Sequence, residues 1–240
     1  KKIILISGGT RGLGIEITKL LINNNYKVIV TGRTSNEDIE NLIKLNQENI
    51  FFESFDLKNI EKIKNFISNL SKKYGRIYGL INNAAVGYDG VLATMHESQI
   101  SELLKINIEA PILLSKYVSR MMLLNNEGRI INISSIIATT GFNGLSVYGA
   151  TKSALIGFTK SLSRELGRAN ITVNCISPGY METEMTTGLN ESKLASIKRR
   201  SPMKKLVELE DVAHAAIYLL SNEASSVTGI TITVDAGSTA

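Results

Sequence analysis

Short apolar runs alternate along the chain with longer segments in which apolar residues recur at the period of a helix. Seven of these runs have the length of a strand, at residues 3–7, 27–31, 50–55, 77–82, 129–134, 171–177 and 230–234. Strands joined by helices pair in parallel, because each helix returns the chain to the same edge of the sheet. The pattern predicts an α/β fold in which residues 1–240 form a single domain, a doubly wound parallel sheet of about seven strands flanked by helices.

Two of the helical segments, at residues 99–125 and 148–169, are long and carry apolar residues on much of their circumference. Such helices need a second covering surface besides the sheet. Asn107 interrupts the first of them. Because asparagine offers the backbone an alternative hydrogen-bonding partner, we expect either a buried polar role or a distortion of the helix at this position.

The composition is that of an ordinary globular protein, with 43% hydrophobic and 20% charged residues. The net charge is +5, but most basic residues alternate with acidic ones, so nucleic-acid binding is not indicated. No stretch approaches the ~20 uninterrupted apolar residues that a membrane span requires. Cys175 is the single cysteine, which fits a reducing compartment, and it lies in an apolar run that predicts core packing. We therefore expect a soluble cytoplasmic protein without a membrane partner.

A metal site is not expected. His96, His214 and Cys175 are far apart in the sequence, without the clustering that metal ligation requires.

Glycines punctuate the turn after the first predicted strand, where S-G-G-T-R-G-L-G places Gly8, Gly12 and Gly14 before an apolar helix. Glycines here allow a tight turn and close approach of the backbone to a pyrophosphate, whose charge the helix N-terminus favours. The position of the pattern, between strand and helix, predicts dinucleotide binding.

The second predicted strand is followed by Gly32 and Arg33, and Arg11 in the glycine turn is able to reach the same space. A guanidinium suits the 2′-phosphate of NADPH, whereas an NADH site usually has an acidic residue there. We therefore expect NADP(H); the alternative is two solvated arginines. Asp56, after the third strand, is placed either for the adenine rim or as a helix cap. The run I-N-N-A-A after the fourth strand fits close approach of a cofactor or a simple turn.

Ser135, Tyr148 and Lys152 form the chemically most informative group. Tyr148 and Lys152 are four residues apart on a predicted helix, which puts both side chains on one face. We expect the ammonium to lower the pKa of the phenol from its usual value near ~10. A serine 13 positions before the tyrosine is able to hold a carbonyl oxygen. The group suits reduction of a carbonyl or oxidation of an alcohol.

Residues 180–205 are too long for a simple connection in this fold class. Beside a cofactor site, such a segment predicts a substrate lid. It contains Lys198, Arg199 and Arg200, which we interpret as a solvated loop or as an attraction for an anionic substrate or carrier.

The motifs resemble those of the short-chain dehydrogenase/reductases, a family with a Rossmann-type fold. They are G-G-T-R-G-L-G, N-N-A-A, Asn107, N-I-S-S, Y-G-A-T-K, S-P-G-Y-M-E-T-E-M and V-T-G-I-T-I-T-V-D-A-G, in family order over essentially the whole chain. Within the family, the chain is most similar to the 3-oxoacyl-[acyl-carrier-protein] reductases of fatty acid biosynthesis. The resemblance implies NADPH-dependent reduction of a 3-oxoacyl thioester, an acyl carrier protein as a possible partner, and a homotetramer.

The resemblance also implies residue roles. Tyr148 would protonate the carbonyl oxygen, Lys152 would lower its pKa and hold the nicotinamide ribose, and Ser135, rather than Ser134, would orient the substrate. Asn107 would bind a water that connects Lys152 to solvent. The implied cofactor-lining residues, besides Tyr148 and Lys152, are Gly8, Thr10, Arg11, Gly12, Leu13, Gly14, Arg33, Asp56, Leu57, Asn83, Ala84, Ala85, Pro178, Gly179, Met181 and Thr183.

Two departures from the family pattern keep alternatives open. Ala85 replaces the usual glycine of N-N-A-G and adds a methyl beside the nicotinamide ribose. The segment N-N-E at 125–127 stands where carrier-dependent reductases have basic residues, and Arg129 and Arg168 are the remaining candidates for a docking surface. The alternatives are an NADP-linked dehydrogenase or reductase of a sugar, polyol or other small ketone, and a non-catalytic subunit that senses NADPH.

Overall fold

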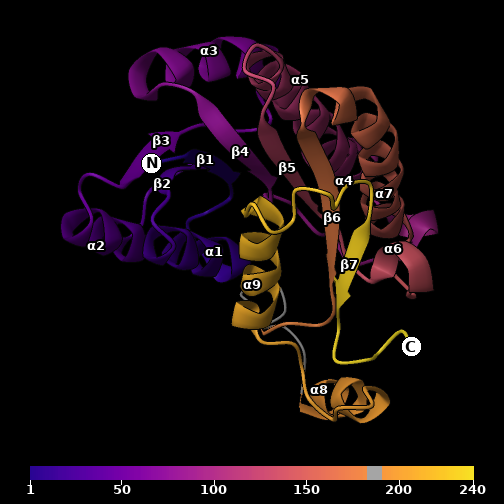
Figure 1. Ribbon diagram of the computed structural model, residues 1–240. Coiled ribbons are helices and arrows are strands. Elements are labelled where there is room, and N and C mark those ends of the chain that lie inside the picture. The colour runs from indigo at the N-terminus through magenta and orange to yellow at the C-terminus, as the bar shows by residue number, and fades with distance from the viewer. Residues whose placement is uncertain (183–190) are drawn as a thin grey trace.

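A seven-stranded parallel sheet forms the centre of the protein (Figure 1). The computed structural model describes residues 1–182 and 191–240. The strand order is β3-β2-β1-β4-β5-β6-β7. The strands are β1 Ile3–Ser7, β2 Lys27–Gly32, β3 Ile50–Ser54, β4 Ile77–Asn82, β5 Gly128–Ile133, β6 Ile171–Pro178 and β7 Thr231–Val234. Every predicted strand lies within one residue of an observed strand at both ends, and the predicted fold class is confirmed.

Helices cover both faces of the sheet, as a doubly wound fold requires. They are α1 Gly12–Asn23, α2 Glu37–Leu45, α3 Ile63–Tyr74, α4 Glu97–Leu104, α5 Ala110–Leu123, α6 Ile137–Thr140, α7 Ser146–Leu166, α8 Glu191–Arg200 and α9 Leu209–Leu220. Short 3₁₀ turns are η1 Ile60–Lys62, η2 Leu92–Thr94 and η4 Gly167–Ala169. Among the described helices, each is too short or too polar to cross a membrane.

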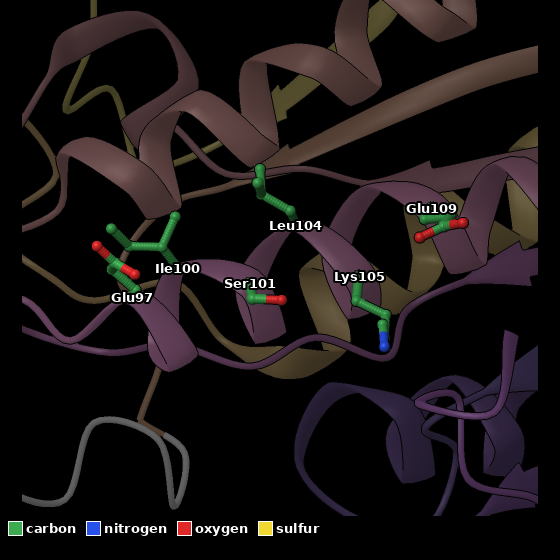
Figure 2. Close-up of a pocket in the computed structure, with 6 residues that line it drawn as sticks. All are labelled: Glu97, Ile100, Ser101, Leu104, Lys105 and Glu109. Carbon is green, nitrogen blue, oxygen red and sulfur yellow. The ribbon is translucent and has the colours of Figure 1, made fainter.

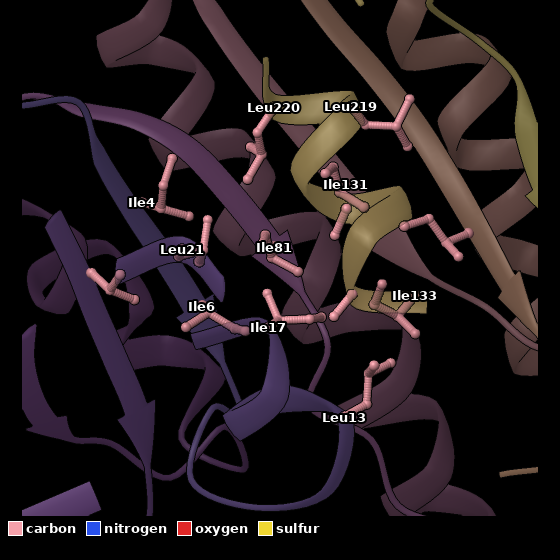
Figure 3. Close-up of a cluster of buried hydrophobic side chains, with 14 of the residues drawn as sticks. Ile4, Ile6, Leu13, Ile17, Leu21, Ile81, Ile131, Ile133, Leu219 and Leu220 are labelled. Carbon is pink, nitrogen blue, oxygen red and sulfur yellow. The ribbon is translucent and has the colours of Figure 1, made fainter. Parts of the chain in front are cut away.

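Two apolar cores lie on opposite faces of the sheet. The first joins side chains of β1, α1 and α9, whose arrangement Figure 3 shows. The second joins the sheet to α3, α5 and the end of α7. Strands β4 and β5 are buried along their whole length. This two-sided burial explains why these strands read as continuous apolar runs rather than as alternating patterns.

The helix predicted at residues 99–125 is interrupted at Asn107. Between α4 and α5, Lys105–Glu109 forms a π-helical segment, η3, and Asn107 is only 1% exposed within it. Both the expected distortion and the expected burial are therefore observed. Pro111 contributes to the break, because it has no N–H to donate to the carbonyl of Asn107 in an α-helix.

The segment predicted as a lid contains a helix. Lys198, Arg199 and Arg200 form the last turn of α8, so the expectation of a solvated loop there is wrong. Basic residues favour the last turn of a helix, whose C-terminus carries partial negative charge. Residues 183–190 of the predicted lid lie outside the described residues.

Candidate active site

The glycine turn leaves β1 where the strand order of the sheet reverses, because β2 and β4 lie on opposite sides of β1. Gly8 and Gly12 have φ angles of +67° and +52°, a region that favours glycine. A Cβ on Gly14 would lie 2.0 Å from the carbonyl oxygen of Gly8. The turn is therefore closed tightly at the crevice where open α/β sheets bind ligands.

The first turn of α1 fits an anionic group. The N-cap residue, Arg11, makes no side-chain capping hydrogen bond, and the turn contains no acidic residue. The N–H groups at a helix N-terminus lack intrahelical partners and carry partial positive charge. Gly12, Leu13 and Gly14 thus present the donors that a pyrophosphate needs, as the glycine pattern predicts.

Hydrogen bonds fasten the segment after β4 to β1. The hydroxyl oxygen of Ser7 accepts from the backbone N–H groups of Asn83 and Ala84, both at 3.1 Å. Nδ2 of Asn83 donates to the carbonyl of Gly8 at 2.8 Å. Ala85 follows and is half-buried. Sequence reasoning missed Ser7, although a small polar residue that closes an apolar strand is the kind of pattern that marks such a role.

The residues predicted for the 2′-phosphate lie on the connections that follow β1 and β2, which are neighbours in the sheet. Arg33 follows β2 and is exposed, and Ser54 donates to its carbonyl at 2.7 Å. Arg11 precedes α1 in extended conformation and is also exposed. The carbonyl of Thr10 accepts from Nδ2 of Asn36 at 2.8 Å, which ties the glycine turn to the start of α2.

Asp56 and Leu57 follow β3 on the adenine side. Oδ1 of Asp56 accepts from the backbone N–H of Lys58 at 2.9 Å, so its carboxylate stabilises the turn itself. Leu57 is 8% exposed and packs in the second core. Asp56 was expected either at the adenine rim or as a helix cap. In the structure its side chain caps a turn rather than a helix.

Ser135, Tyr148 and Lys152 meet beside the carboxyl end of β5. The side chain of Ser135 lies close enough to the Tyr148 hydroxyl to lower the pKa of the phenol. Nζ of Lys152 lies 5.6 Å from the centroid of the Tyr148 ring and donates to the carbonyl of Ile133 at 2.9 Å. Ser134 is turned elsewhere, because its hydroxyl donates to the carbonyl of Lys152 at 2.8 Å. Of the two serines, Ser135 is the one that contacts the phenol.

Burial controls the protonation of this group. It raises the pKa of Tyr148 to about 12, although the nearby Ser135 side chain acts in the opposite direction. It lowers the pKa of Lys152 to about 8. The expectation that Lys152 lowers the pKa of Tyr148 is therefore wrong for this structure, because desolvation dominates. Tyr148 keeps its proton at neutral pH, the state that a proton donor requires.

Asn107 holds the segment after β4 from the other side. Its Oδ1 accepts from the N–H of Val86 at 2.9 Å, and its Nδ2 donates to the carbonyl of Val86 at 2.9 Å. Nδ2 also donates to the hydroxyl of Thr151 at 3.2 Å. Thr151 lies between Tyr148 and Lys152 in α7, so Asn107 connects the predicted cofactor wall with the helix that carries the catalytic candidates.

Pro178 and Gly179 end β6 at the same edge of the sheet. The carbonyl of Pro178 accepts from the N–H of Ile136 at 3.0 Å, which fixes the backbone beside Ser135. A Cβ on Gly179 would lie 2.7 Å from Cα of Asp235. Met181 is half-buried against the first core, whereas Thr183 lies outside the described residues.

A separate hollow of about 330 Å³ lies on α4 and η3 (Figure 2). None of its lining residues belongs to the predicted site; they are Glu97, Ile100, Ser101, Leu104, Lys105 and Glu109. Across residues 1–182 and 191–240, no three His, Cys, Asp or Glu side chains gather as metal ligands would.

Comparisons with known proteins agree with this geometry. A family model described as enoyl-(acyl carrier protein) reductase matches residues 8–239. The 3-oxoacyl-[acyl-carrier-protein] reductase FabG of Salmonella typhimurium is 35% identical over 238 residues, which are 98% of this chain and 96% of that protein.

Two solved structures have the same fold over nearly their whole length. ElxO with NADP bound is 31% identical, with a TM-score of 0.91 and coverage of 99% of this chain and 98% of that chain. A gluconate 5-dehydrogenase from Burkholderia cenocepacia, in complex with NADP and tartrate, is 25% identical, with a TM-score of 0.94 and coverage of 99% and 95%. The protein belongs to the short-chain dehydrogenase/reductase family.

Proposed function

We propose that this protein reduces a carbonyl group to a hydroxyl with NADPH and that its substrate is a 3-oxoacyl thioester. As a member of its family it is an NADP-dependent oxidoreductase. The observation that carries the proposal is the position of the Tyr148 hydroxyl beside Ser135 at the carboxyl end of β5, where burial raises its pKa to about 12. The substrate class is supported by the 3-oxoacyl-[acyl-carrier-protein] reductase activity named for the Salmonella relative.

The crevice fits NADP(H), which supplies the hydride when it is bound. The uncapped first turn of α1 would hold the pyrophosphate, and Arg11 and Arg33 would hold the 2′-phosphate. Asn83, Ala84 and the residues after β6 would line the nicotinamide half. The NADP bound by ElxO and by the gluconate 5-dehydrogenase supports this cofactor.

The protein's own groups handle the proton. Ser135 would orient the carbonyl oxygen, and the hydroxyl of Tyr148 would donate its proton to that oxygen. Lys152 lies beneath the phenol ring with a lowered pKa, so it is able to exchange a proton near neutral pH. The side-chain amide of Asn107 already hydrogen-bonds to Val86 and Thr151. The backbone carbonyl of Asn107 receives no α-helical hydrogen bond, because Pro111 has no N–H to donate. We therefore assign the backbone carbonyl of Asn107 as the group that binds the predicted water between Lys152 and solvent.

Exchange of Arg33 for aspartate is expected to shift cofactor preference from NADPH to NADH. The change removes a guanidinium from the 2′-phosphate and supplies an acceptor for the 2′-hydroxyl. One charge-assisted contact is worth ~1.5–3 kcal/mol, so the Kd for NADPH should rise about 10- to 100-fold. Fluorescence titration with both cofactors measures the shift, and Lys44→Asp on α2 gives the same charge change as a control. Unchanged preference for NADPH would contradict the role of Arg33.

The substrate class is tested by assaying NADPH oxidation with an acetoacetyl thioester and a panel of ketoses. We expect kcat/KM for the thioester to exceed that for any ketose by at least about tenfold. Faster turnover of a ketose would favour the alternative of a sugar or polyol reductase. The similarity to the gluconate 5-dehydrogenase supports that alternative. Cofactor binding without turnover of any carbonyl substrate would favour the NADPH-sensing subunit.

A docking surface for an acyl carrier protein has less support than the thioester itself. Arg129 is 5% exposed, and its guanidinium donates to the carbonyls of Gly128 and Asn170. It is therefore excluded as a docking residue, whereas Arg168 is exposed on η4.

Four further expectations stay predictions. They are the homotetramer, the cytoplasmic location, the single catalytic domain and the lid at residues 180–205.

A further inference from the structure

An ion pair joins two segments that leave the sheet at its carboxyl edge. Nζ of Lys58, in the connection after β3, lies 2.8 Å from Oε1 of Glu102 on α4. The hydroxyl of Tyr88, in the connection after β4, lies close enough to the same carboxylate for each group to shift the pKa of the other. We call this group the Lys58–Glu102–Tyr88 bridge. None of its members belongs to the predicted site.

The strand order places the two ends of the bridge on opposite sides of the predicted adenosine site. In the strand order, β2 and β1 lie between β3 and β4. With neighbouring strands ~4.8 Å apart, the ends of β3 and β4 are roughly 14 Å apart. The glycine turn follows β1 and Arg33 follows β2, the two strands between them. Arg33 also lies near enough to Glu102 to lower the pKa of its carboxyl, after the larger effect of the hydrogen bond from Lys58.

Each end of the bridge adjoins a predicted wall of the cofactor site. Lys58 directly follows Leu57, and its backbone N–H donates to Asp56. Tyr88 follows Val86, which Asn107 holds in place. A change in the distance between Lys58 and Glu102 would therefore move both walls relative to each other.

We propose that the Lys58–Glu102–Tyr88 bridge sets the width of the adenosine half of the crevice and slows release of the cofactor. Lys58 and Glu102 are then positioning residues for cofactor binding, and the inference rests on the proposed NADPH-binding function. An exposed ion pair contributes little to folding stability, so variants that lose the bridge should still fold.

Two single variants separate this role from a general effect of charge. Lys58→Met removes a positive charge and Glu102→Gln removes a negative one. A long-range electrostatic effect on the anionic cofactor would weaken binding in the first variant and strengthen it in the second. Loss of the bridge weakens binding in both.

The experiment measures the dissociation rates of NADPH and NADH from the full chain by stopped-flow fluorescence. We expect both variants to release each cofactor about fivefold faster, the factor for loss of one ion pair. The double variant Lys58→Glu/Glu102→Lys should return both rates to within about twofold of the wild-type rates. Lys73→Met breaks a comparable surface pair with Glu53, 2.7 Å long, and should leave the rates unchanged.

Several outcomes would overturn the proposal. Opposite effects of the two single variants would show long-range electrostatics, and faster release of NADPH alone would make Lys58 a phosphate ligand. Wild-type dissociation rates in both variants would exclude a role of the bridge in cofactor release, while the proposed NADPH binding would stand. A wild-type protein that binds neither cofactor would overturn the bridge together with the proposed function.

Discussion

Replacing Tyr148 with phenylalanine is expected to lower kcat for carbonyl reduction about a thousandfold, within the range that general acid catalysis contributes. The change removes the hydroxyl that donates the proton and leaves the ring that packs beside Lys152. Ser135 would lose its neighbouring hydroxyl, but its position after β5 is held by backbone hydrogen bonds of Ser134 and Ile136. The reaction would then depend on proton transfer from water.

Steady-state kinetics and NADPH titration separate chemistry from binding in this variant. The Kd for NADPH should change less than about threefold, because the Tyr148 hydroxyl is only one of many groups predicted to line the cofactor. Tyr218→Phe removes the same atom from an exposed residue of α9 and should leave kcat unchanged. If Tyr148→Phe retained wild-type kcat, Tyr148 would not be the proton donor.

Gly14→Ala is expected to raise the Kd for NADPH by about two orders of magnitude. Its Cβ would lie 2.0 Å from the carbonyl oxygen of Gly8 and 2.8 Å from Nδ2 of Asn83, so backbone must move. The movement displaces the N–H groups of the first turn of α1 from the pyrophosphate. Loss of one or two charge-assisted hydrogen bonds, ~3 kcal/mol in total, corresponds to about a hundredfold in Kd.

Gly157→Ala provides the matched control for this substitution. Gly157 lies in α7, and its Cβ would meet no atom within 4 Å. The Gly157→Ala protein is expected to bind NADPH as the wild type does and to have equal or higher thermal stability. Circular dichroism establishes that Gly14→Ala is folded before its affinity is compared. A folded Gly14→Ala protein with wild-type affinity would remove the glycine turn from the cofactor site.

The limits of the strands were predictable because most of them are apolar runs, which in β4, β5 and β6 reflect burial on both faces. The catalytic candidates were also visible, since Tyr148 and Lys152 share one helix and their spacing fixes a common face. The break at Asn107 was expected from its polarity in an apolar segment. These inferences depend on local sequence, and the structure confirms the strand limits, the fold class and the break.

Properties that depend on tertiary packing could not be predicted in the same way. The direction of the Tyr148 pKa shift is set by desolvation from surrounding elements, not by its distance along the helix from Lys152. The burial of Arg129 arises where η4 meets the start of β5. The contact of Lys58 with Glu102 joins residues 44 positions apart that no periodicity relates.

The buried ammonium of Lys152 makes folding itself depend on pH. Its pKa is about 8 in the folded protein and 10.5 in the unfolded chain. Below pH 8 the group is charged in both states, and its desolvation destabilises the folded one. Between pH 8 and 10.5 the unfolded chain binds a proton that the folded protein has released, so the free energy of unfolding rises with pH. The gain is on the order of 3 kcal/mol, which is the folding free energy that burial of the Lys152 ammonium costs at neutral pH.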